Sequence, residues 1–372
     1  MVKESTVRHI LHVVGARPNF IKAAPVMSAV QRRGGFRQTL VHTGQHYDVN
    51  MSDIFFRQLG LPEPDIDLEV GSASHAIQTA EIMIRFADVV ERECPDLVLV
   101  YGDVNSTVAA ALVCAKLGIS VGHVEAGLRS FDRRMPEEIN RILTDQLADL
   151  LFTPSEDGDQ NLLNEGVPGE KIYLVGNTMI DTLIRLLPQA SVTWSPQRWG
   201  YTDGQPFALA TLHRPSNVDE SYALGDIMSA LVDIGRNLPV LFPVHPRTRA
   251  QLTTVGFDAD GAGLHLIQPL GYLEFLALQQ HAALVITDSG GIQEETTFLG
   301  VPCLTVRENT ERPVTVTLGT NILVGQDFDR LRAEVARILD GEVREGRIPP
   351  LWDGRAAERI VDGIQSWFRG PT

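Results

Sequence analysis

The sequence has few cysteines, few aromatic residues, no excess of positive charge and no long apolar run. Its three cysteines, Cys94, Cys114 and Cys303, are widely spaced and form no C-x-x-C pair, so a disulfide framework or a cysteine-based zinc site is not indicated. No apolar run reaches the ~18 residues of a membrane-spanning helix. No signal peptide precedes the first strand pattern, and we therefore expect a cytoplasmic protein.

The charge balance is strongly acidic. The 32 Lys and Arg residues face 47 Asp and Glu residues, a net charge of −15, which argues against a nucleic-acid duplex or an anionic membrane as the main partner. A small anionic ligand is still compatible, because a few arginines make one positive pocket on an acidic body. With 372 residues, 44% of them apolar, we expect two soluble globular domains.

Two common site motifs are also missing. No G-x-G-x-x-G follows the first strand pattern, so a nicotinamide dinucleotide site is unsupported. There is no H-E-x-x-H, and His123 and Glu125 have no nearby cysteine partners. We expect no metal ion.

Strand and helix patterns alternate through both halves of the chain, which predicts an α/β protein of two Rossmann-like, doubly wound parallel sheets. The expected N-terminal domain is 1–190, followed by a linker at 191–206 that is rich in Pro, Trp, Gly and Gln. Residues 207–350 form the second domain, and a last helix within 351–372 is expected to pack back on the first. If the carboxyl edges of the two sheets face each other, one cleft receives residues from both.

The stretch from Val285 to Pro302 has the pattern of an anion site. A buried strand ends at a turn, and Gly290 and Gly291 then open a helix whose free N–H groups suit a diphosphate. Glu294 and Glu295 are expected in the first turn, where carboxylates suit the helix dipole and can also accept from ligand hydroxyls. An ordinary strand-to-helix turn is the alternative for a Ser-Gly-Gly segment.

Three carboxylates, Asp103, Glu125 and Glu137, are expected at strand exits or at a helix start in the first domain. A close group of carboxylates has shifted pKa values that suit acid and base roles, although each one alone can be a helix cap or a solvated loop residue. Arg17 and Lys22 are expected between the first strand and a helix over 23–33.

Histidine and arginine residues follow the strands of the second half. His213 and His245 come directly after strand patterns, and each is as compatible with a scaffold role as with catalysis. Arg312 belongs to a polar loop beside the Gly-Gly helix, where it is either part of a solvated charge run or a clamp for a diphosphate.

Taken together, these motifs resemble the non-hydrolysing UDP-N-acetylglucosamine 2-epimerases, and they run in the order of that family over nearly the whole chain. The segments that carry the resemblance are Gly15-x-Arg17-Pro18 with Lys22, Gln45-His46, Gly102-Asp103, His123 to Arg129, Pro136 to Arg141, Gly176 to Thr178, His213-Arg214, Pro243 to His245, Asp288 to Glu295 and Glu311 to Pro313.

The resemblance implies a glycosyltransferase-B-like fold, a homodimer, a UDP-sugar substrate and no nicotinamide or metal cofactor. It also implies anti elimination of UDP to 2-acetamidoglucal followed by re-addition of UDP. For UDP binding it assigns Arg17, Ser289, Gly290 and Gly291 at the diphosphate, Glu295 at the ribose, and also Lys22 and Arg312. Arg312 and His213 assist at the phosphates and the leaving group, and the residues assigned to catalysis are Asp103, Glu125, Glu137 and His213.

Several alternatives stay open at this stage. A shorter segment between Arg129 and Pro136 than in better-known members is compatible with a related UDP-sugar as substrate. A hydrolysing epimerase, a UDP-sugar binding protein and a retaining glycosyltransferase on the same fold are further alternatives. Gln45 and His46 match a second, activating site of the family, but Ala76 and Ile77 stand where its arginine is expected.

Overall fold

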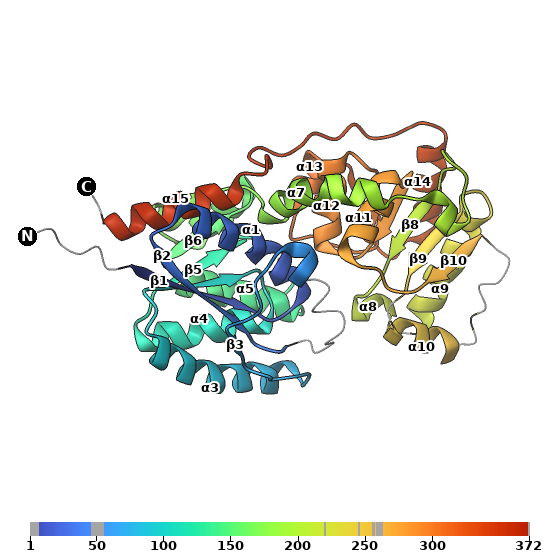
Figure 1. The fold of residues 1–372 in the computed structure, drawn as a ribbon. Coiled ribbons are helices and arrows are strands. Elements are labelled where there is room, and N and C mark those ends of the chain that lie inside the picture. Colours follow the sequence, from blue (N-terminus) through green and yellow to red (C-terminus); the bar gives the residue numbers. More distant parts are fainter. Residues whose placement is uncertain are drawn as a thin grey trace, which may run out of the picture. The chain divides into compact units, whose positions relative to one another are not determined.

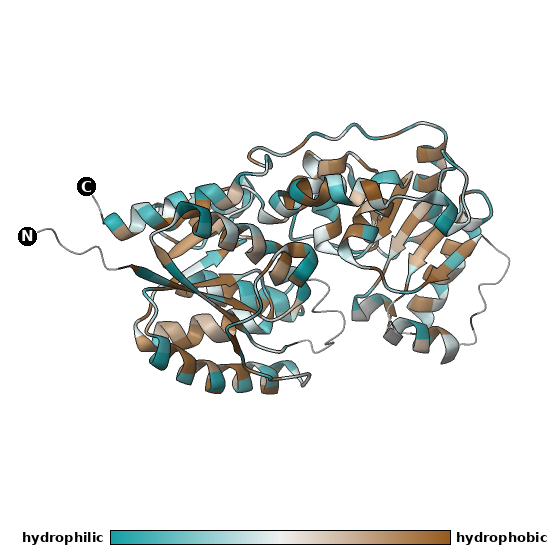
Figure 2. Ribbon diagram, viewed as in Figure 1, coloured by the Kyte–Doolittle hydropathy of each residue, from teal (hydrophilic) through white to brown (hydrophobic). Residues whose placement is uncertain are grey.

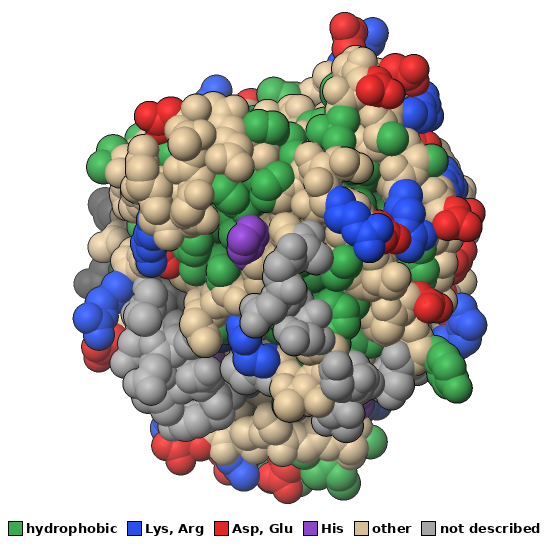
Figure 3. All heavy atoms as spheres, turned by 90° about the vertical axis from the view of Figure 1, so that its right-hand side faces the viewer, with side chains coloured by type: hydrophobic (Ala, Val, Ile, Leu, Met, Phe, Trp, Pro, Cys, Tyr) green, Lys and Arg blue, Asp and Glu red, His purple; other side chains and the backbone are tan. Residues whose placement is uncertain are grey.

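The structure, a computed structural model, describes residues 7–45, 56–218, 221–244, 246–254, 257 and 263–370. The chain forms two compact units, one of residues 1–184 and 350–372 and the other of residues 185–349. No helix among the described residues is long and apolar enough to cross a membrane. Charged side chains of both signs are interspersed on the face drawn in Figure 3, with no broad basic surface there.

Unit 1 is built on a parallel seven-stranded sheet in the order β3-β2-β1-β4-β5-β6-β7. Its strands are β1 Arg8–Val14, β2 Phe36–His42, β3 Ile66–Asp67, β4 Leu97–Tyr101, β5 Val121–Val124, β6 Leu150–Thr153 and β7 Ile172–Leu174. β4 is buried at every position, as expected for a central strand covered on both faces.

Helices cover both faces of this sheet, with α1 and α15 on one side and α3 and α4 on the other (Figure 1). The helices of unit 1 are α1 Arg17–Arg33, α3 His75–Glu93, α4 Asn105–Leu117, α5 Pro136–Leu147, α6 Glu156–Asn164, the 3-10 turn η1 Gly169–Lys171, α7 Thr178–Thr193, which runs on into unit 2, and α15 Ala356–Arg369.

The last helix, α15, packs on α1 and is fixed by α7. The Asp181 carboxylate on α7 accepts from the backbone N–H groups of Ala356 and Ala357 at 3.1 and 2.7 Å, which satisfies two free donors at the start of α15. The units divide within α7, and the segment predicted as a linker, 191–206, ends α7 and forms η2 Pro196–Trp199. Tyr201 from this segment is buried in a core cluster of unit 2.

Unit 2 repeats the design with a parallel six-stranded sheet in the order β10-β9-β8-β11-β12-β13. Its elements are β8 Ala208–Thr211, α8 Pro215–Val218, α9 Ser221–Gly235, β9 Val240–Pro243, α10 Pro246–Thr254, β10 Leu264–Ile267, α11 Tyr272–His281, β11 Leu284–Thr287, α12 Gly290–Leu299, β12 Cys303–Thr305, α13 Pro313–Thr317, β13 Asn321–Leu323 and α14 Phe328–Leu339. Hydrophobic strands run between helices of mixed polarity in both units (Figure 2).

The start of α1 differs from the prediction of a helix over 23–33. It begins at Arg17, because Pro18 is tolerated in a first turn and the Asn19 side chain accepts from the backbone N–H groups of Gly15 and Ala16, both at 3.1 Å. Pro25 lies inside the helix without ending it. Arg17 and Lys22 therefore belong to the first two turns of α1.

Candidate active site

Both sheets reverse their strand order at one point, between β1 and β4 in unit 1 and between β8 and β11 in unit 2. In open parallel sheets, ligands bind outside the carboxyl ends of the strands at this switch point. The predicted site residues follow these strands or their neighbour β5. Arg17 and Lys22 follow β1, Asp103 follows β4, His213 follows β8, and Ser289 follows β11.

The exit of β1 in unit 1 is tightly packed against the neighbouring strands. The Asn19 amide donates to the Tyr101 backbone carbonyl at 2.7 Å and so ties the exit of β1 to the end of β4. A Cβ on Gly15 would lie 2.0 Å from Oγ of Ser106 and 2.5 Å from Oγ1 of Thr43, so only glycine fits this turn.

Lys22 and Glu125 form a buried ion pair at the switch point of unit 1. Glu125 follows β5 with φ of +73°, an unfavourable backbone for a residue with a side chain, which the surrounding structure must stabilise. Gly102, directly after β4, makes room for the pair, because a Cβ there would lie 2.8 Å from Nζ of Lys22 and 3.1 Å from Oε2 of Glu125.

Asp103 belongs to a second set of charges. The buried Arg141 guanidinium on α5 forms ion pairs with Asp103 and with Glu138. Asn140, also on α5, donates to the backbone carbonyl of Asp103 at 2.9 Å. Asp103 does not act as a helix cap, because α4 begins at Asn105 after Val104 and no side chain caps it.

Glu137 differs from the two other predicted carboxylates. It lies in the first turn of α5 and is half-buried, and no described residue forms a hydrogen bond or an ion pair with its carboxylate. The neighbouring Glu138, in contrast, is buried and fully engaged. Of the three predicted carboxylates, Glu137 is therefore the one whose oxygens are open to a ligand.

A buried hydrogen-bond network of His123, Asp145 and Arg129 was not predicted from the sequence. Nδ1 of His123 lies 2.6 Å from Asp145 and Nε2 lies 2.8 Å from the Gly102 carbonyl, while Arg129 donates to Asp145 at 2.7 Å. Burial alone raises the pKa of the Asp145 carboxyl, but His123 and Arg129 outweigh it and keep the pKa below its ordinary value. The sequence feature that could have indicated this network is the helical spacing of Glu138, Arg141 and Asp145, which places all three on one face of α5.

The residues predicted for a second site are only partly described, because His46 lies outside the described residues. Gln45 is buried, and its side-chain oxygen accepts from the backbone N–H and the hydroxyl of Ser106 at 3.1 and 2.7 Å. Gln78 donates to the Gln45 carbonyl at 3.0 Å. Gln45 thus contributes to the packing at the start of α4.

In unit 2, Asp288 organises the exit of β8. Its fully buried carboxylate accepts from the backbone N–H groups of His213 and Arg214 and from the Asn217 amide at 2.9–3.1 Å. Burial alone raises the pKa of Asp288, but His213, with Nδ1 at 3.0 Å, and these donors lower the pKa below its ordinary value. The His213 side chain is 56% exposed and so remains available to a ligand. The predicted His245 lies outside the described residues.

The start of α12 carries a cluster of guanidinium groups around one carboxylate. Buried Glu311 pairs with Arg312, with Arg307 at 2.6 Å and with Arg214 at 3.7 Å. A Cβ on Gly290, the first residue of α12, would lie 2.3 Å from NH1 of Arg312, so the missing side chain admits the guanidinium to the helix terminus. Arg312, the helix dipole and the free N–H groups meet there.

The prediction that Glu294 and Glu295 stand in the first turn of α12 is wrong. The helix begins at Gly290, so both lie in the second turn and are buried. Their oxygens are stabilised by side chains rather than by the helix dipole. Glu294 pairs with Arg312 at 2.9 Å, and Glu295 accepts from the Tyr272 hydroxyl at 2.8 Å.

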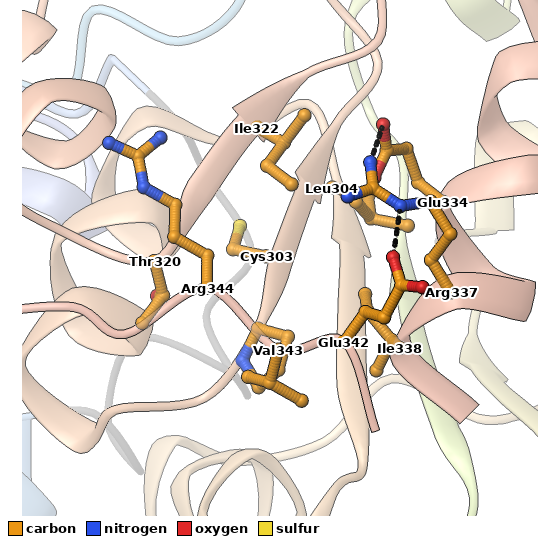
Figure 4. Close-up of a pocket in the computed structure, with 11 residues that line it drawn as sticks. Cys303, Leu304, Thr320, Ile322, Glu334, Arg337, Ile338, Glu342, Val343 and Arg344 are labelled. Carbon is orange, nitrogen blue, oxygen red and sulfur yellow. Dashed lines mark hydrogen bonds and ion pairs between the residues drawn. The ribbon is translucent and has the colours of Figure 1, made fainter. Parts of the chain in front are cut away.

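A cavity of about 540 Å³ lies away from these residues, at the amino ends of β12 and β13 (Figure 4). Three of its charged side chains pair with one another, with Arg337 bonded to Glu334 and Glu342, and Arg344 donates to the Thr317 backbone carbonyl at 3.3 Å. We therefore assign the site by the strand-order switch and not by cavity size. No described group of three or more His, Cys, Asp or Glu side chains could hold a metal ion.

The chain matches known proteins over nearly its whole length. Residues 28–365 match the family model of UDP-N-acetylglucosamine 2-epimerase. A Methanococcus maripaludis protein named UDP-N-acetylglucosamine 2-epimerase is 42% identical, with 94% of this chain and 96% of that protein covered. A Pseudomonas aeruginosa protein named UDP-2,3-diacetamido-2,3-dideoxy-D-glucuronate 2-epimerase is 44% identical, with 95% and 98% covered.

Comparison with solved structures leads to the same family. The Methanocaldococcus jannaschii UDP-GlcNAc 2-epimerase, crystallised with UDP-GlcNAc and UDP, superposes with a TM-score of 0.89 at 41% identity and covers 96% of this chain and 99% of its own. A lipopolysaccharide outer core galactosyltransferase at 13% identity and a TM-score of 0.53 shows the fold alone. The predicted pair of parallel α/β domains in a glycosyltransferase-B-like fold is confirmed.

We predict that Gly290→Ala weakens UDP binding by about 10- to 100-fold, because the new methyl group displaces Arg312 from the start of α12 and charge-assisted hydrogen bonds of this kind contribute roughly 1.5–3 kcal/mol. Titration calorimetry with UDP measures the effect. The matched control is Gly225→Ala on α9, where a Cβ meets nothing within 4 Å. Equal affinity in the two variants would show that Arg312 does not act at this terminus.

We also predict a pH effect from Glu295. Burial raises the pKa of the Glu295 carboxyl from 4.5 to about 7, so between these pH values the folded protein keeps a proton that the unfolded chain releases. The stabilisation of the folded state by this proton is complete below pH 4.5 and is lost as the pH rises through 7. Between those limits the free energy of unfolding should fall by roughly 3 kcal/mol from this group, since one pKa unit is about 1.4 kcal/mol. In urea unfolding from pH 5 to 8, Glu295→Gln should lack this slope. Parallel pH profiles for wild type and variant would contradict it.

Proposed function

The chain belongs to the UDP-N-acetylglucosamine 2-epimerase family, and we propose that it interconverts UDP-N-acetylglucosamine and UDP-N-acetylmannosamine. The observation that carries this is the 42% identity to an epimerase of that name over 94% of the chain. The enzyme is an isomerase that changes the configuration at C2 of a nucleotide sugar.

The proposed route is anti elimination of UDP to 2-acetamidoglucal followed by re-addition of UDP, with a proton added to C2 from the face opposite to the one that lost it. The C2 proton of the intact sugar is not next to a carbonyl, so no ordinary side chain can remove it directly. Departure of the anomeric diphosphate gives the ring cationic character that acidifies C2. The protein must therefore stabilise the leaving diphosphate and place a base near C2.

We assign the base role to Glu137, because its carboxylate is half-buried and has no described partner. Glu125 and Asp103 are each paired with a buried cation, Lys22 and Arg141, and such carboxylates suit stabilisation of a cationic ring. In this scheme Lys22 acts through Glu125. Its predicted direct contact with UDP is the alternative role.

For the nucleotide, we propose that the diphosphate takes the N–H groups of Gly290 and Gly291 and the hydroxyl of Ser289 together with Arg312. The Ser289 N–H itself donates to Oγ1 of Thr287 at 3.0 Å. Arg17 and His213 assist the leaving group, and Glu295 accepts from the ribose. This rests on the glycine-lined start of α12 and on the guanidinium against it. Gln45 and His46 remain candidates for a second UDP-sugar site.

A UDP-diacetamidoglucuronate is the second candidate substrate, favoured by the 44% identity to the Pseudomonas aeruginosa epimerase. The two candidates are separated by incubating the protein with each UDP-sugar and resolving the products by chromatography and mass spectrometry. We expect UDP-N-acetylmannosamine from UDP-N-acetylglucosamine. Turnover of the diacetamido uronic acid alone would transfer the assignment to that substrate, and release of a free sugar would support a hydrolysing enzyme.

We further propose a homodimer formed through α3. Ile77 and Ile84 on this helix are 58% and 64% exposed and stand two turns apart, with the exposed Ala76 and Ala80 beside them. Apolar side chains gathered on one exposed helix face are typical of an interface. Light scattering should give twice the 40.9 kDa chain mass. A monomeric mass would contradict the dimer.

We predict that Glu137→Gln lowers kcat by at least about 100-fold with UDP affinity retained, because general acid–base groups contribute roughly 10²–10⁴-fold. Glu125→Gln should lower kcat as well, and it should also lower stability, since it leaves Lys22 buried without its carboxylate. Steady-state kinetics and thermal unfolding separate the two effects. Full activity in Glu137→Gln would remove Glu137 from the reaction.

A further inference from the structure

Phe131 has an unusual environment for a large aromatic residue. Its side chain is 79% exposed, and its backbone adopts φ of +59°, in the left-handed region that bulky residues rarely occupy. Both features are unfavourable in the protein alone. The exposed ring packs on little of its own unit, and the left-handed backbone is strained for a bulky residue. Strained residues of this kind persist where the surroundings fix them, and they occur often at ligand sites.

The backbone at Phe131 is fixed by the carboxylate machinery. The Phe131 N–H donates to Glu138 at 2.8 Å, and the backbone N–H and hydroxyl of Ser130 donate to the same carboxylate at 2.9 Å. Glu138 is also paired with Arg141, which in turn pairs with Asp103. One buried carboxylate therefore couples the position of Phe131 to that of a proposed catalytic group.

The chain also places Phe131 between two proposed catalytic residues. It lies on the segment that connects Glu125, at the exit of β5, with Glu137, at the start of α5. The reaction needs a contact that retains the intermediate, and the charged residues cannot provide it. After elimination the sugar is a neutral glycal without a bond to UDP, so ion pairs to the diphosphate no longer retain it.

We propose that the Phe131 ring lies against the glycal and retains it until UDP adds back. This inference rests on the proposed function. The step is balanced: the C1–O bond to UDP breaks, the C2 proton passes to the base and a C1=C2 double bond forms. In the return step UDP bonds to C1 again and a proton adds to C2 from the opposite face, which gives the epimer. An aromatic face suits this task, because it contacts the C–H groups of a sugar ring without any charge on the ligand.

The first experiment measures binding without turnover. Every protein in this titration, including the one that keeps Phe131, carries Glu137→Gln so that UDP does not add back to the glycal. Synthetic 2-acetamidoglucal is titrated into the UDP-saturated protein and followed by saturation-transfer NMR. Phe131→Ala should weaken glycal binding by at least about 10-fold and leave UDP affinity unchanged, and Phe131→Tyr should bind as wild type does. The matched control is Val192→Ala, which truncates a side chain that is 86% exposed on α7. Wild-type glycal affinity in Phe131→Ala, or no glycal binding by the wild type, overturns the proposal.

The second experiment measures the fate of the intermediate during turnover of UDP-N-acetylglucosamine. Phe131→Ala should release at least about 10-fold more free UDP and glycal per epimer formed, whereas a general loss of fold would lower both products together. An unchanged ratio overturns the proposal. Failure of the proposed function is distinct, because the wild type would then convert none of this substrate while the glycal titration still tests Phe131. A change only in the molar mass of Phe131→Ala would make the ring a protein contact and also overturn the proposal.

Discussion

Both units depend on a glycine that makes room for a buried ion pair at the exit of a switch-point strand. Gly102 follows β4 and borders Lys22 and Glu125, and Gly290 follows β11 and borders Arg312 and Glu311. β4 and β11 occupy equivalent places in their sheets, directly across the switch from β1 and β8. A side chain at either glycine would occupy the volume of the charged groups. The ion pairs at the carboxyl ends of both sheets therefore depend on glycine at these positions.

Such pairs constrain the protein because a buried charge is costly unless its partner is present. Removing one member of a buried pair typically costs about 3–5 kcal/mol, whereas exposed pairs contribute much less. The three predicted carboxylates of unit 1 therefore differ in whether they are paired with a cation. Glu125 and Asp103 are each paired with a cation, and Glu137 alone has no described partner. This difference assigns electrostatic stabilisation to the first two and proton transfer to Glu137.

The alternation of strands and helices was predictable, because apolar runs such as Leu97–Tyr101 end at glycines and recur in both halves. The start of α12 was also predictable from Gly290 and Gly291. The start of α1 was not, since it depends on Asn19 accepting from two backbone groups, a local contact that no periodicity shows. The partners of the site residues were least predictable. In the cluster around Glu311, Arg307 and Arg312 are neighbours of Glu311 in the chain, but Arg214 follows β8, and only the folded structure brings it to them.

The central claim is that the configuration at C2 changes through loss and return of the C2 proton. A proton NMR time course of the purified protein with UDP-N-acetylglucosamine in D₂O tests it most directly. The account predicts UDP-N-acetylmannosamine with deuterium at C2, together with deuterium appearing at C2 of the remaining substrate as the reaction reverses. Formation of UDP-N-acetylmannosamine that keeps its original C2 proton would contradict the elimination route.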